Sequence, residues 1–241
     1  MEGLSVAQAT NHRGLLNNFE RNGEPMPTII SSLSDRSKAR MLFFAYVLFV
    51  LFTDNDFFFL AFNLFLAFAA LELSYLLPLF RARLIREWPA SIAVYSIFVL
   101  MSPNVFYMVT DLIHMNLFDF DYLDEMAMEE WWHFFLLAAG VFIALFFYVL
   151  MVQSVQRLLG AGRWSRMLLL LFVLLGSIGI YIGRFLRFHS VHLFTEPWLL
   201  LERLLQSFSK DAFLFVSWIT LLQLLAIAVF GRGTGRGTPH E

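Results

Sequence analysis

The chain has 241 residues, of which 59% are hydrophobic, 15% are charged and none is cysteine. A soluble domain is nearer half apolar and about a quarter charged, so a soluble fold would lack the polar side chains that its surface needs. These values predict a multi-pass membrane protein. They exclude disulfides, thiolate metal sites and cysteine nucleophiles, and the net charge of −2 predicts no nucleic-acid partner.

The polar and apolar segments divide the chain into three parts. Residues 1–38 are mixed and polar and lack an early apolar run, which predicts a largely disordered cytoplasmic arm and no cleaved signal peptide. Residues 39–230 contain long apolar runs and form the predicted membrane domain. Residues 231–241 are rich in glycine and predict a flexible cytoplasmic tail.

The apolar runs predict an all-α polytopic bundle of about six transmembrane helices. About 20 apolar residues are needed to cross a bilayer core of about 30 Å, because an α-helix rises about 1.5 Å per residue. The predicted spans are residues 41–53, 57–80, 88–109, 131–153, 167–183 and 211–230. The first span is short. It could extend backward if Lys38 and Arg40 reach the interface, and the alternative is a helical hairpin that returns to the same side.

The positions of lysine and arginine predict the orientation of the spans. Of the 17 cationic residues, 13 lie in the N-terminal arm, in the loops after the second and fourth spans, and in the tail. Cytoplasmic loops carry an excess of Lys and Arg, so both termini are predicted to be cytoplasmic. Between the last two spans, Pro197 begins an amphipathic stretch that predicts a short helix in the outer interface.

The third predicted span ends in a series of polar residues. Pro103 removes a backbone donor, so we expect a kink or opening there, with Asn104 satisfying the freed carbonyls. The polar residues beyond the kink are Tyr107, Thr110, Asp111 and His114. Asp111 and His114 are three residues apart and would share one helix face. Both therefore become candidates for the base and acid of a reaction.

The fifth predicted span delivers cations to the same outer face. Its glycines, Gly176, Gly179 and Gly183, would allow a neighbouring helix to approach closely. Arg184 and Arg187 follow at a spacing of three, and then His189 and His192 at the same spacing. His133 at the start of the fourth span and Asn63 in the outer third of the second belong to the same predicted face. Ionisable groups at membrane depth are costly, so this convergence indicates a functional site.

These residues also have structural interpretations. Arg184 and Arg187 could extend to the headgroups or pair with the acidic outer loop, and Asp111 could form a structural pair with Arg184. Glu72 is the deepest acid, and its expected partner is Arg81 or Arg83.

The motifs in these spans resemble a known family. The runs NLFLAF (63–68), SPNVFYMVTDLIHM (102–115) and GIYIGRFLRFHS (179–190) are similar to those of bacterial membrane proteins grouped as domain of unknown function 1361. The resemblance covers roughly residues 41–230. It implies that the polar residues described above are motif residues of the family, and it places the protein in a bacterial inner membrane. It implies no role for His189 and His192, which stand where the family pattern has Asn and Asp.

Four functional hypotheses follow from the sequence. The first is an outward-facing site for an anionic lipid headgroup, or a similar phosphate or carboxylate ligand. Its candidate ligand-binding residues are Arg184, Arg187, Asn104, Tyr107, Thr110 and Asn63. The second is a structural or assembly subunit that binds another membrane protein. The third is a transporter or channel. The fourth is a metallohydrolase with His114, Asp111 and either His133 or His189 as metal ligands. No cofactor is predicted, and the sequence leaves open whether the protein is an enzyme.

Overall fold

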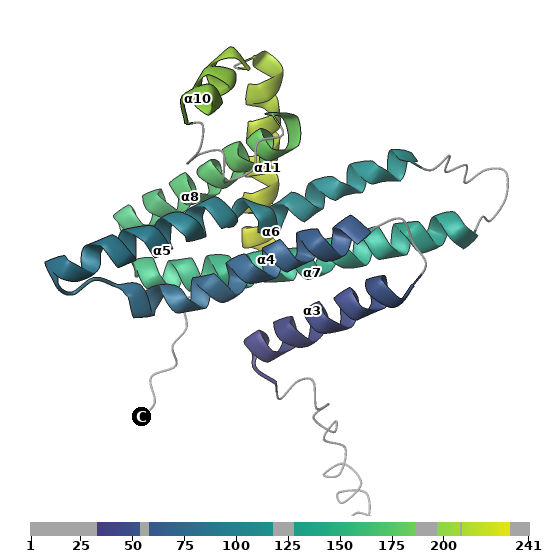
Figure 1. The fold of residues 1–241 in the computed structure, drawn as a ribbon, viewed down its shortest axis with the longest axis horizontal. Coiled ribbons are helices and arrows are strands. Elements are labelled where there is room, and N and C mark those ends of the chain that lie inside the picture. The colour runs from purple at the N-terminus through teal and green to yellow at the C-terminus, as the bar shows by residue number, and fades with distance from the viewer. Residues whose placement is uncertain (1–32, 54–57, 118–127, 187–196, 208, 232–241) are drawn as a thin grey trace, which may run out of the picture. The chain divides into compact units, whose positions relative to one another are not determined.

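The computed structural model describes residues 33–53, 58–117, 128–186, 197–207 and 209–231. Every secondary-structure element in these ranges is a helix (Figure 1), as the all-α prediction requires. The chain divides into two units, Met1–Lys38 and Ala39–Glu241. Apart from the first turn of α3, the helices described below belong to the larger unit.

Five helical stretches in the described residues are long and apolar enough to cross a membrane. They correspond to the second to sixth predicted spans, and the protein is therefore a multi-pass membrane protein. The stretches are α4 (Phe58–Leu76) with η1 (Leu77–Phe80); η2 (Ile85–Glu87) with α5 (Trp88–Met101), α6 (Pro103–Tyr107) and η3 (Met108–Leu117); α7 (Met128–Leu159); α8 (Arg163–Tyr181) with η4 (Ile182–Leu186); and α11 (Lys210–Phe230).

Two further helices match sequence predictions. The first predicted span, residues 41–53, overlaps α3 (Asp35–Phe52), and this helix begins before residue 41. Whether this segment crosses the membrane or forms a hairpin that returns to the same side stays a prediction. The helix predicted to begin at Pro197 is α10 (Pro197–Gln206), and its place in the outer interface also stays a prediction.

Helix α3 packs through one apolar stripe and one ion pair. Its buried residues, Ala39, Phe43, Tyr46 and Val50, recur every three or four residues, which keeps them on one helix face. The Phe43 ring stacks on Phe68 of α4, with 4.2 Å between the ring centroids. This face therefore attaches α3 to α4.

The partner of Glu72 differs from the predicted Arg81 or Arg83. Arg40 of α3 donates from Nε and Nη2 to the two carboxylate oxygens of Glu72, at 2.8 Å and 2.9 Å. The reason is geometric: Arg40 lies on a helix packed beside α4 and can present its guanidinium fork sideways. The prediction considered only the loop that follows the second span.

Helix α7 forms the centre of the described bundle. In its most apolar part, 61% of the residues are buried. The corresponding share in the other four membrane-spanning stretches is 17–44%. It packs against α4, η3, α6, α8 and α11, and Leu136, Leu137, Ala144 and Phe147 of α7 are fully buried. The outer faces of the other helices expose large apolar side chains such as Leu168, Leu171 and Trp218, as a lipid-facing surface requires.

A buried polar network joins α7, α8 and α11. Gln223 of α11 donates from Nε2 to the Ser177 hydroxyl at 2.7 Å, and its Oε1 accepts from the Tyr148 hydroxyl at 2.9 Å. Thr220 also donates to Ser177, at 2.8 Å. Within a bilayer the hydrophobic effect does not drive helices together, so hydrogen bonds of this kind help to stabilise their association.

The helix of the third span breaks at the predicted place. Its second part, α6, packs against a glycine of α8 and a glycine of η4. Helix α5 ends at Met101 and α6 begins at Pro103. An ideal Cβ on Gly179 would lie 2.6 Å from Pro103 Cγ, and one on Gly183 would lie 3.2 Å from Tyr107 Cε2. Only glycine therefore permits α6 to lie this close to α8 and η4.

Ser102, not Asn104, satisfies a carbonyl at this break. The Ser102 hydroxyl donates to Val99 O at 2.9 Å. Within the described part of the chain, the Asn104 side chain makes no hydrogen bond. Ser102 lies one residue before the proline, and its short side chain reaches back along its own helix to the carbonyl three residues earlier.

Candidate functional site

Two irregular helices carry the polar residues predicted as a site. The ten residues of η3 form a 3₁₀ helix, and η4 is a single π-helical turn. Runs of 3₁₀ helix beyond three or four residues are uncommon, and π turns occur frequently at functional sites. With three residues per turn, Asp111 and His114 of η3 lie directly above one another, and η4 holds Arg184.

Asp111 is the central residue of this site. Its carboxylate is 1% exposed, and both of its oxygens are used. Oδ2 accepts from Asn63 Nδ2 of α4 at 2.8 Å, and Oδ1 accepts from Arg184 Nη2 of η4 at 2.7 Å. A buried carboxylate needs such compensation, because an unpaired charge loses its hydration on burial. Three segments far apart in sequence therefore meet at one side chain.

Arg184 is held along one edge of its guanidinium group by Thr110 and Asp111. Its Nε and Nη2 donate to Thr110 Oγ1, and its Cζ lies 4.2 Å from the centroid of the Tyr107 ring. The Thr110 hydroxyl in turn donates to Tyr107 O at 2.6 Å. The side chain is 17% exposed. Among the described residues Nη1 has no hydrogen-bond partner, so one edge of the guanidinium remains available.

One ring nitrogen of His114 faces the backbone of Asp111, and the other has no hydrogen-bond partner among the described residues. Nδ1 lies 2.9 Å from Asp111 O and 3.8 Å from Asp111 Oδ1. A carbonyl oxygen can only accept, so the geometry requires the proton on Nδ1 and leaves Nε2 for other partners. The ring packs on Phe59 of α4, with 4.6 Å between the centroids, and 27% of the side chain is exposed.

The predicted set thus divides into residues that meet and residues that do not. Asn63, Tyr107, Thr110, Asp111, His114 and Arg184 form one contact network. Asn104 lies on α6 without a side-chain hydrogen bond in the described chain, and His133 is buried in α7. Arg187, His189 and His192 lie outside the described residues.

The metallohydrolase hypothesis gains no support from this geometry. No group of three or more His, Asp or Glu within metal-binding reach occurs in the ranges that the structure describes. Asp111 already spends both oxygens on Asn63 and Arg184, and the adjacent guanidinium would repel a cation.

Sequence reasoning missed Phe59 and the polar network of Gln223. Phe59 belongs to an unbroken phenylalanine run, which gives no signal for one position over its neighbours. Gln223 is different, because an amide inside an apolar span is a visible signal for an interhelical hydrogen bond.

The helices and this site define a multi-pass membrane protein with a buried carboxylate–guanidinium centre. Residues 62–226 match the family model described as protein of unknown function DUF1361, which covers more than half of the chain. The chain belongs to this family, and the six residues of the contact network all lie within the matched range. No curated protein and no solved structure matches it.

Proposed function

We propose that the protein binds an anionic headgroup, carrying a phosphate or a carboxylate, at the exposed side of the Arg184–His114 pair. In this proposal Arg184 Nη1 donates to the anion, and His114 Nε2 donates as well in the imidazolium form of the ring. Asp111, Asn63 and Thr110 hold these donors in place, and the Tyr107 ring supports the guanidinium plane. Arg187, outside the described residues, would supply a second guanidinium.

The observation that carries the proposal is the construction of the buried pair on two irregular helices. A buried ion pair is weak evidence for stability, because apolar residues of similar volume often serve as well or better. Ionisable residues inside membranes are instead associated with function. The π turn and the long 3₁₀ run, which turn Arg184 and Asp111 toward each other, support the same interpretation.

The surrounding membrane suggests the class of ligand. The site belongs to segments that end two predicted spans, so a headgroup phosphate or carboxylate is the anion most available to it. The proposal itself requires binding only and assigns no reaction.

Native mass spectrometry of the full chain released from mild detergent tests this function. We expect a retained lipid with an anionic headgroup that is lost in Arg184→Ala. Arg203→Ala on the exposed part of α10 is the matched control, because it removes the same side chain from the same predicted membrane side. Equal lipid retention in both variants would contradict the proposal.

The alternative function is a structural or assembly subunit. It is favoured by one observation, that a single side chain, Asp111, joins three segments, α4, η3 and η4. The double variant Asp111→Leu with Arg184→Met separates the two functions. A ligand site predicts a folded protein without lipid, whereas an assembly role predicts retained lipid and loss of a co-purifying polypeptide.

A further inference from the structure

A cationic cavity lies near the other end of α4, away from Asp111. Tyr75 of α4, Pro78 of η1, and Ser154, Arg157 and Leu158 of α7 form part of its wall. Arg81 and Arg83, from the segment after η1, complete it, and the cavity has a volume of about 530 Å³. Asn63 and Tyr75 are twelve residues apart on α4, which corresponds to about 18 Å along a helix.

The lining of this cavity carries three guanidinium groups and no carboxylate among the described residues. Arg157 donates from Nε to Gln153 O at 3.2 Å, which leaves its two terminal nitrogens without a described partner. Glu72 of α4 is paired with Arg40. Glu87 lies on η2, four residues after Arg83. Its carboxylate accepts from the backbone N–H groups of Arg83 and Leu84, at 2.8 Å and 3.3 Å.

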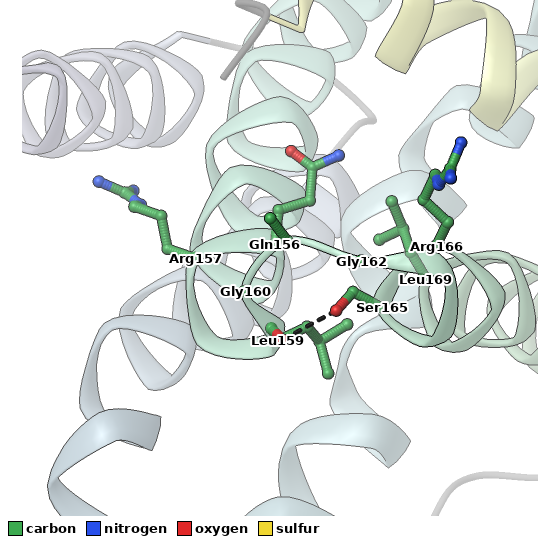
Figure 2. A pocket seen from close by; sticks show the side chains of 9 residues that line it. Gln156, Arg157, Leu159, Gly160, Gly162, Ser165, Arg166 and Leu169 are labelled. Atoms are coloured by element: carbon green, nitrogen blue, oxygen red, sulfur yellow. Dashed lines mark hydrogen bonds between the residues drawn. The ribbon is translucent and has the colours of Figure 1, made fainter. Parts of the chain in front are cut away.

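A second cavity adjoins the first and shares Arg157 with it. It lies at the turn between α7 and α8, has a volume of about 420 Å³, and is lined by Arg166, Gln156 and Ser165 in addition to Arg157. Figure 2 shows Arg157 and Arg166 extending from the two sides of this turn, with Gln156 between them. The Ser165 hydroxyl donates to Leu159 O at 2.9 Å and fixes the turn.

An excess of arginine at this end has an ordinary explanation, since cytoplasmic loops are rich in Lys and Arg. That explanation accounts for the number of cations but not for their common cavity. Arg81 and Arg83 come from a segment more than 70 residues before Arg157. Like charges around one cavity repel each other, and an anion that binds them removes this cost.

We infer that the cavity lined by Arg81, Arg83 and Arg157 is a second binding site, and that its ligand carries a phosphate group. A phosphate presents its oxygens tetrahedrally, in different directions, which suits it to accept from three guanidinium groups at once, whereas the two oxygens of a carboxylate lie in one plane. Pro78 and Leu158 provide an apolar wall for the rest of the ligand. The phosphate comes either from an anionic lipid headgroup or from a soluble phosphate compound.

The inference is independent of the Arg184 site. The two sites use different elements, so each can be removed without the other. A protein with both should retain two ligands, one lost in Arg184→Ala and the other in Arg157→Gln. Failure of one assignment therefore leaves the other intact.

The test uses the delipidated full-length chain in mild detergent and compares Arg157→Gln with Arg163→Gln. Arg163 is the exposed first residue of α8 and lines neither cavity, so it is a matched control for charge. One arm adds phosphatidylglycerol or phosphatidylcholine and counts bound lipids by native mass spectrometry. The other adds inorganic phosphate and measures thermal unfolding.

We expect phosphatidylglycerol to bind about tenfold more weakly to Arg157→Gln, which is the scale of one lost charged hydrogen bond. The control Arg163→Gln should bind phosphatidylglycerol as tightly as the native protein. The double variant Arg81→Gln/Arg83→Gln should bind it more weakly than Arg157→Gln does. If Arg157→Gln binds as many lipids as the native protein but is no longer stabilised by inorganic phosphate, while Arg163→Gln still is, the ligand is a soluble phosphate compound. Equal behaviour of Arg157→Gln and Arg163→Gln in both arms would overturn the inference.

Discussion

Substitution of Asp111 by leucine should destabilise the protein strongly. The change removes a carboxylate that is 1% exposed and leaves Arg184 Nη2 and Asn63 Nδ2 without their acceptor. Removal of one partner from a buried ion pair costs about 3–5 kcal/mol. Arg184 keeps its bonds to Thr110 and is 17% exposed, so partial hydration places the expected cost near the lower end, about 3 kcal/mol.

The double variant Asp111→Leu/Arg184→Met gives the opposite expectation. It removes both charges and fills their space with apolar atoms, so no uncompensated charge remains. Replacement of a whole buried pair is often neutral or stabilising, and we therefore expect the double variant to lie within about 1 kcal/mol of the native protein. The second substitution should recover most of the stability lost in the first.

Thermal unfolding in detergent, followed by circular dichroism, measures both effects. A loss of about 3 kcal/mol corresponds to a decrease of about 6–12 °C in Tm for a chain of this size. Arg203→Met on the exposed part of α10 should leave Tm unchanged. A single variant Asp111→Leu as stable as this control, or a double variant no more stable than the single one, would refute the reasoning.

Three further substitutions test the packing and the remaining polar contacts. Gly179→Ala should cost about 1–3 kcal/mol, because its Cβ would lie 2.6 Å from Pro103 Cγ, and a Tm equal to that of the native protein would show that α6 moves freely. Gln223→Leu should cost about 1–3 kcal/mol by leaving the Tyr148 hydroxyl without its acceptor, and the added substitution Tyr148→Phe should recover part of it. Arg40→Gln should leave Tm close to that of the native protein, because this side chain is 49% exposed and water screens its charge, and a clear loss of Tm would contradict this expectation.

Much of the site was predictable because polar residues are conspicuous in apolar spans. Asn63, Asp111 and Arg184 each interrupt an apolar run near the same predicted face, and the structure brings them into contact. The break at Pro103 follows from the missing backbone donor and needs no tertiary information. The glycines at positions 179 and 183 predicted a close helix contact, and their partners are Pro103 and Tyr107.

The remaining features depend on tertiary contacts that the sequence does not record. An apolar pattern does not distinguish a 3₁₀ helix from an α-helix over ten residues, so the stacking of Asp111 and His114 in η3 was not predictable. The partner of Glu72 depends on the packing of α3 beside α4, which brought Arg40 within reach in place of a loop arginine. The shared cavity of Arg81 and Arg157 likewise appears only once η1 and α7 are packed.

The separation of the two proposed sites argues against a transport path between them. Along α4, the residues between Asn63 and Tyr75 include Leu64, Ala67, Ala70 and Leu71, all fully buried and apolar. The one ionisable group in that interval, Glu72, is engaged by Arg40 on the side facing α3. A transported ion needs polar partners throughout its path, because each unsatisfied polar or charged group in an apolar medium costs several kcal/mol. Apart from Ser74, the buried face of α4 between the two sites is apolar, so this helix provides no polar path from one proposed site to the other.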